Sequence, residues 1–132
     1  DLDVSAYQVE VHDGFVVHRV PPEPGSVVAG FWAWVWPTTM LNVYGGGMNI
    51  ERVRPAGDGK CVIDYTYIFE PGAADDAVER AVAQSGEVTA EDRDICERVQ
   101  RNLETGRAKQ GPLSPVHEQG IVAFRAWQSG QV

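Results

Sequence analysis

The sequence predicts an α+β fold in which an antiparallel β-sheet grips a long C-terminal helix. Residues 7–69 show the alternation and the β-branched and aromatic content typical of strands, whereas residues 73–127 show helical periodicity. The change falls at residues 70–72, where Glu-Pro-Gly interrupts both patterns. Because the strands precede the helices instead of alternating with them, we expect one α+β domain over residues 1–132, a length that suits a single core.

The predicted strands begin with a hairpin. Residues 7–12 and 15–20 alternate on either side of Asp13-Gly14, a pair that favours a tight turn. A proline-rich loop at residues 21–25 follows. The remaining strands are expected at residues 27–37, 40–44, 48–53 and 60–69, with the glycines of residues 45–47 in the turn of a second hairpin.

Three helices are expected in the second half of the chain. Residues 73–84 predict a short helix, residues 89–107 a long one and residues 116–127 a last one. Pro112 and Pro115 separate the last two.

The composition is that of a soluble globular protein. Hydrophobic residues make up 43% and charged residues 23%, and no apolar run approaches the roughly 20 residues of a membrane-spanning helix. The net charge of −8 argues against a nucleic-acid partner, which needs a positive field. With no signal peptide pattern at the start, we expect a cytoplasmic protein that contacts neither nucleic acid nor membrane.

The two cysteines, Cys61 and Cys96, lie in different settings, one in a predicted strand and one in a predicted helix. We therefore expect buried free thiols and no disulfide. Neither belongs to a CxxC pair, so the sequence encodes no zinc or iron–sulfur site of its own.

Asp92 is unusual because it falls on the apolar stripe of the long helix. At 3.6 residues per turn it shares a face with Ile95, Cys96, Val99 and Leu103. The opposite face carries two pairs with the i,i+4 spacing of surface ion pairs, Asp94 with Arg98 and Glu97 with Arg101.

Two interpretations of Asp92 stand open on the pattern alone. Thr89 and Asp92 resemble a capping box, where an acid is also favoured by the helix dipole. Alternatively, a carboxylate facing a core needs a cation, a metal or several donors, which suits a metal ligand or an acid/base group.

The run E-D-x-x-I-C-E-x-V-Q at residues 91–100 and the run QGPLSPVHEQGIVAF at residues 110–124 resemble the C-terminal end of Rieske-type non-haem iron oxygenase α subunits. Residues 36–55, WPTTMLNVYGGGMNIERVRP, resemble a strand of the same family and the strand after it, although Thr38 and Thr39 replace residues usual in the family. The resemblance is nearest to the choline and glycine betaine monooxygenase branch. It implies a helix-grip, SRPBCC-like catalytic domain.

The resemblance also implies a chemistry. The family holds a catalytic Fe(II) with two histidines and one aspartate, and the matching aspartate is Asp92, with Glu91 as a supporting or capping neighbour. It implies that a reductase or ferredoxin passes electrons through a [2Fe–2S] cluster to this iron. The iron then activates O2 for a mono- or dioxygenase reaction that hydroxylates or demethylates a small organic substrate, and the full-length protein is a homotrimer.

The chain departs from the family pattern in what it lacks. The paired-histidine motif and the cluster motif of the family are absent, and neither His12, His18 nor His117 occupies a matching place. We therefore expect this chain to be the C-terminal part of an oxygenase catalytic domain, and to be inactive alone.

Five further residues are candidates for the substrate pocket: Trp32, Trp34, Trp36, Asn42 and Tyr44. Tryptophan faces attract quaternary ammonium groups, but tryptophans on one strand face also serve as core. The alternative function is a non-enzymatic helix-grip module that binds a small ligand. An upstream reading frame encoding the missing motifs would distinguish the oxygenase from this module.

Overall fold

The computed structural model describes residues 7–20, 30–109 and 111–130, and it confirms the α+β class. The chain forms two compact units. One unit takes in residues 1–68 and 113–132, and it holds the sheet and the last helix. The other, residues 69–112, holds the long helix.

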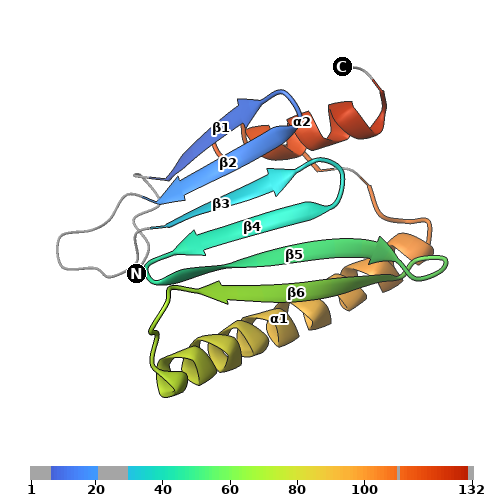
Figure 1. The fold of residues 1–132 in the computed structure, drawn as a ribbon. Helices are drawn as coiled ribbons and strands as arrows, with labels where there is room; N and C mark the ends of the chain where they lie inside the picture. Colours follow the sequence, from blue (N-terminus) through green and yellow to red (C-terminus); the bar gives the residue numbers. More distant parts are fainter. Residues whose placement is uncertain (1–6, 21–29, 110, 131–132) are drawn as a thin grey trace. The chain divides into compact units, whose positions relative to one another are not determined.

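The sheet has six strands in the order in which they occur along the chain (Figure 1). The strands are β1 (Gln8–His12), β2 (Phe15–Val20), β3 (Gly30–Val35), β4 (Thr39–Tyr44), β5 (Gly47–Pro55) and β6 (Cys61–Phe69). They agree with the predicted strands to within a few residues. The predicted loop at residues 21–25 and the first residues of the predicted third strand, 27–29, lie outside the described residues.

Both predicted hairpins are present. Gly14 has φ 76° and Gly46 has φ 85°, a left-handed conformation that glycine adopts without strain. β1 pairs with β2 and β4 with β5 in antiparallel register, so consecutive strands are neighbours throughout this part of the sheet. The short turns thereby produce a simple meander.

The core of this unit lies in the central strands. Val16 is opposite Trp34 on one face, and Val17 is opposite Ala33 on the other. Val16, Val17 and Ala33 are buried. The two faces of β2 and β3 are therefore both covered, as the apolar character of β3 predicted.

Helix α2 (Gln119–Gln128) begins at Gln119 and not at Val116 as predicted. The reason is a turn in the preceding segment: the Glu118 carboxylate accepts a hydrogen bond from the Ser114 N–H, and the Glu118 N–H donates to the Ser114 carbonyl at 3.1 Å. These bonds hold residues 114–118 in a turn, so the helix starts only beyond it.

The long helix α1 (Asp75–Glu104) is one continuous helix of 30 residues, and the prediction of two helices was wrong. Its only glycine, Gly86, has no positive φ and does not break the helix. Thr89 lies in the interior, where its hydroxyl donates to the Ser85 carbonyl at 2.8 Å. The capping-box interpretation of Thr89 and Asp92 is therefore wrong, because no helix begins there. Propensity summed over the whole segment outweighs the local glycine.

Both cysteines are free, as predicted, but Cys61 and Cys96 are exposed, so the expectation that they are buried was wrong. Cys61 begins β6 at the end of the sheet order, and Cys96 lies on α1, none of whose residues is buried.

The predicted ion pair of Asp94 with Arg98 is present at 2.6 Å, whereas no such pair joins Glu97 to Arg101 in the described part of the chain. None of the described helices is both long and apolar enough to span a bilayer.

Candidate functional site

Asp92 lies on α1 beside an exposed apolar stripe. Ile95 is 51% exposed, Val99 50% and Leu103 55%, and they follow Asp92 at helical spacing. Neither an ion pair nor a hydrogen bond joins the Asp92 carboxylate to another residue that the structure describes. Asp92 therefore offers an exposed, unengaged carboxylate in line with this apolar stripe.

Glu91 precedes Asp92 on the same helix and is also exposed. Successive helical residues point about 100° apart, so the two carboxylates do not share a face. Asp92 alone continues the apolar stripe.

The described residues do not bring together a complete ligand set for a metal. A facial triad needs two histidines and a carboxylate. Within residues 7–20, 30–109 and 111–130, no three His, Cys, Asp or Glu side chains gather closely enough to hold a metal ion. Asp92 fits the carboxylate position chemically, and the histidine positions are not filled by this part of the chain.

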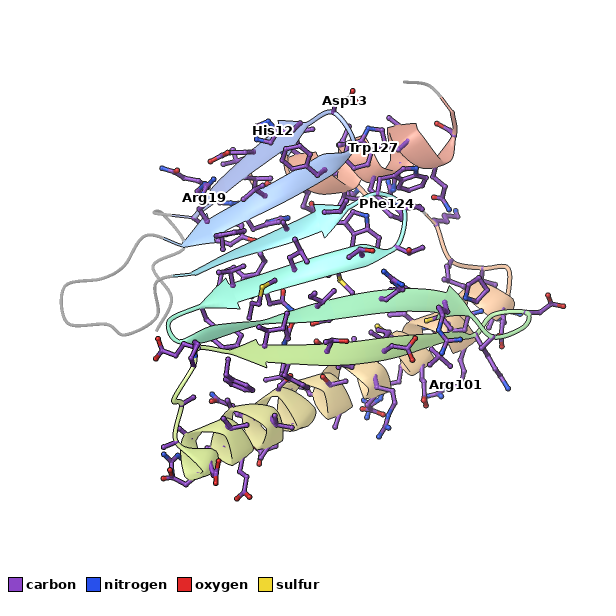
Figure 2. All side chains as sticks on the ribbon, viewed as in Figure 1. His12, Asp13, Arg19, Arg101, Phe124 and Trp127 are labelled. Carbon is purple, nitrogen blue, oxygen red and sulfur yellow. The ribbon has the colours of Figure 1, made fainter. Side chains whose placement is uncertain are left out.

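The three predicted tryptophans share one face of the sheet, as expected. Trp32 is opposite Asn42 and Trp34 is opposite Met40 in the register of β3 and β4. The same face meets α2, because Trp34 and Trp36 both make edge-on contacts with Phe124 at a ring-centroid distance of 5.4 Å. The aromatic cluster thus attaches α2 to the sheet (Figure 2 labels Phe124 on α2).

Asn42 and Tyr44 are part of a polar patch further along this face. The Asn42 amide donates to Asn49 Oδ1 at 2.6 Å and also to the Glu51 carboxylate. Asn49 is only 6% exposed, so its oxygen needs this donor. Tyr44 is half-buried, and burial raises the pKa of its phenol. Both amide hydrogens of Asn42 are engaged within the sheet, which leaves only its carbonyl oxygen for a ligand.

Two pockets are lined by predicted tryptophans, one by Trp34 and the other by Trp36. We call the first the sheet–α2 pocket; it measures about 280 Å³ and is lined by Val16, His18, Trp34, His117, Gly120, Ile121 and Phe124. The second, near the β1–β2 turn, is lined in part by Trp36. Of these two pockets, Trp34 lines the first and Trp36 lines the second.

His18 is one of two histidines that line the sheet–α2 pocket, the other being His117. Tyr7 Oη lies 2.5 Å from His18 Nδ1, which fits a phenol donating to a neutral imidazole. Burial lowers the pKa of His18 and raises the pKa of Tyr7, so both groups stay uncharged near neutral pH. Because neither partner carries a charge, the pair is suited to hydrogen bonding in an apolar pocket.

The sequence analysis did not predict the residues that contact the tryptophans, His18 and Asn42. Phe124 and Trp127 carry a recognisable signal, because their i,i+3 spacing places both on one side of a helix. The contact between Tyr7 and His18 follows from the register of the first hairpin, in which Val9 is opposite His18. The buried position of Asn49 has no signal in the sequence.

Comparison with known proteins identifies the family. Residues 8–131 match the model of the ring hydroxylating alpha subunit (catalytic domain). Choline monooxygenase, chloroplastic, from Beta vulgaris is 29% identical over 136 residues, which cover 96% of this chain and 30% of that protein. The enzyme of the same name from Arabidopsis thaliana is 37% identical over 89 residues, 66% of this chain and 21% of that protein.

The chain thus spans about 30% of the length of the first of these relatives. The match extends over nearly all of the described residues, on both units. The chain therefore belongs to the ring-hydroxylating α-subunit family of Rieske oxygenases, within its catalytic domain and close to the choline monooxygenases.

Proposed function

We propose that this chain is the C-terminal part of the catalytic domain of a Rieske-type oxygenase, and that Asp92 is the carboxylate ligand of its mononuclear Fe(II). The observation that supports the proposal is the place of Asp92, an unengaged acid in line with the apolar stripe of α1 and within the motif that resembles the family. Asp92 is exposed, so the support comes from its position on this stripe and within the motif, and not from the cost of a buried charge.

The iron, when bound, supplies the activation of O2. The role of Asp92 is to provide one anionic ligand from a rigid element. It lies in the interior of a continuous helix, many residues from either end, so fraying does not displace it. Glu91 is proposed as a supporting neighbour whose negative charge favours the metal, since an ionised carboxylate cannot donate a hydrogen bond to Asp92.

The remaining parts of the reaction are proposed for the complete protein. Two histidine ligands, a [2Fe–2S] cluster and a reductase or ferredoxin donor complete the system, and three subunits assemble into a trimer. The product is a hydroxylated or demethylated form of a small organic substrate. Because the similar proteins are named choline monooxygenases, a quaternary amine is the first substrate to test, ahead of an aromatic acid.

The test compares Asp92→Ala with Asp94→Ala in the complete protein. Both variants remove one carboxylate from α1, but Asp94 lies elsewhere on the helix and pairs with Arg98 at 2.6 Å. We expect Asp92→Ala to lose mononuclear iron by elemental analysis while its cluster absorbance persists, which shows that the fold is intact. Asp94→Ala should keep both the mononuclear iron and the cluster absorbance. Glu91→Ala should weaken iron retention by about 10- to 100-fold, the usual effect of removing a group that supports a ligand.

Full mononuclear iron in Asp92→Ala would contradict the ligand role. A complete wild-type protein that holds neither iron nor cluster would favour the alternative, a non-enzymatic ligand-binding module.

A further inference from the structure

A groove lies between the β1–β2 turn and α2, and we call it the hairpin–α2 groove. It measures about 860 Å³ and is lined by Val11, His12, Asp13, Gly14, Trp36, Ala123, Ala126 and Trp127. All of these residues belong to the sheet-containing unit, whereas Asp92 belongs to the other. In Figure 2, Asp13 marks the turn and Trp127 marks the part of α2 beside it.

The backbone holds the aromatic wall of this groove in place. The Trp36 N–H donates to the Gly14 carbonyl at 2.8 Å, which ties the end of β3 to the hairpin turn. The Trp36 and Trp127 rings lie 6.1 Å apart at an angle of 54°, so they form two inclined walls. Ala123 and Ala126 line the groove beside Trp127 on α2, and their small side chains take up little of its volume. Both tryptophans are half-buried, which fixes their orientation without covering them.

The charge of the groove is negative. Asp13 is exposed, and its carboxylate forms no ion pair with any residue that the structure describes. His12 is already engaged, because its Nε2 lies 3.2 Å from the Glu10 carboxylate and its ring stacks on Phe15 at 4.5 Å. Neither lysine nor arginine is among the lining residues. The net charge of −8 adds a general attraction for cations.

We propose that the hairpin–α2 groove binds a small methylated ammonium ion. Two inclined indole faces and one carboxylate provide the two interactions that such a cation makes, cation–π contact and charge pairing. An anion would be repelled by Asp13. A neutral apolar molecule would pack on the tryptophans but would desolvate the carboxylate without compensation. The proposal does not depend on Asp92 or on iron.

The test is a 19F NMR titration of the complete protein labelled with 5-fluorotryptophan, with Trp36 and Trp127 assigned through Trp36→Phe and Trp127→Phe. The probe is tetramethylammonium chloride, and neopentyl alcohol serves as the neutral probe of similar shape. We expect saturable shifts of the Trp36 and Trp127 signals with the cation, with a dissociation constant in the millimolar range, and at least tenfold weaker binding of the alcohol.

Asp13→Asn keeps the Asx–Gly turn and should raise the dissociation constant about three- to tenfold. Asp58→Asn is the matched control, since Asp58 is an exposed acid in the turn between β5 and β6. This variant should leave the dissociation constant of the probe unchanged. Asp92→Ala should bind the probe as the wild type does, which separates this site from the proposed iron site.

Equal binding of the alcohol, or an unchanged dissociation constant in Asp13→Asn, would overturn the proposal. So would loss of the shifts in Asp92→Ala, because the cation would then be binding at the iron site.

Discussion

Removal of the Phe124 ring should release α2 from the sheet. Phe124 makes edge-on contacts with both Trp34 and Trp36, so one side chain joins the helix to β3 and to the residue after it. Truncating a fully buried phenylalanine to alanine costs about 3–5 kcal/mol. Phe124 is half-buried, so we expect about half of that, roughly 2 kcal/mol, including its aromatic pairs.

The assay is hydrogen exchange of the α2 amides, measured by mass spectrometry, because it reports the opening of this helix separately from global unfolding. A loss of about 2 kcal/mol corresponds to roughly thirtyfold faster exchange. Val122→Ala is the matched control, since Val122 lies on the same helix and is 54% exposed, and it should accelerate exchange less than about threefold. The α2 amides of Phe124→Leu should exchange at a rate between those of Phe124→Ala and Val122→Ala.

The comparison of Phe124→Ala with Val122→Ala can contradict this role of Phe124. If Phe124→Ala exchanges no faster than Val122→Ala, the aromatic cluster does not hold α2, and the attachment of the helix must come from other contacts.

Two further predictions concern α1 and the sheet–α2 pocket. Gly86→Ala should stabilise α1 by about 1 kcal/mol, because Gly86 is helical and an added Cβ meets nothing within 4 Å. Gly106→Ala should destabilise the helix end, because Gly106 has φ 67°. Hydrogen exchange of the helix amides measures both effects, and a destabilised Gly86→Ala variant would indicate a break in the helix. His18 should titrate below its ordinary pKa of 6.5 in an NMR pH series, because burial disfavours its charged form. Since the unfolded chain then binds more protons, the contribution of His18 to stability is present above pH 6.5 and is lost as the pH falls from 6.5 through the lowered pKa. His18→Phe should remove this part of the pH dependence, and a pKa at or above 6.5 would show that the imidazole is not desolvated.

The strands were largely predictable because their signal is local. Alternation and turn glycines define β1, β2, β4 and β5, and pairing between consecutive strands then follows from the shortness of the turns. The helix boundaries were less predictable. The predicted break between residues 84 and 89 is absent, because helical propensity summed over the 30 residues of α1 overrides it. Side-chain hydrogen bonding at Glu118 delays the start of α2.

The candidate site was predictable only as a list of residue types. The position of Asp92 in line with an apolar stripe follows from helical geometry alone, and the structure places Trp32, Trp34 and Trp36 on one face as strand geometry requires. The contacts among these residues were not predictable from the sequence. Trp34 and Trp36 line different pockets, and the Asn42 amide is hydrogen-bonded to Asn49.

The sequence by itself determined the α+β class, the two hairpins and the helical face on which Asp92 lies, because these depend on turn residues and on periodicities of two and 3.6 residues. Only the tertiary structure decided that Phe124 joins α2 to the tryptophans and that Asp13 lies beside Trp36 and Trp127. Those contacts join residues far apart along the chain, and they depend on how strands and helix pack, which periodicity does not specify.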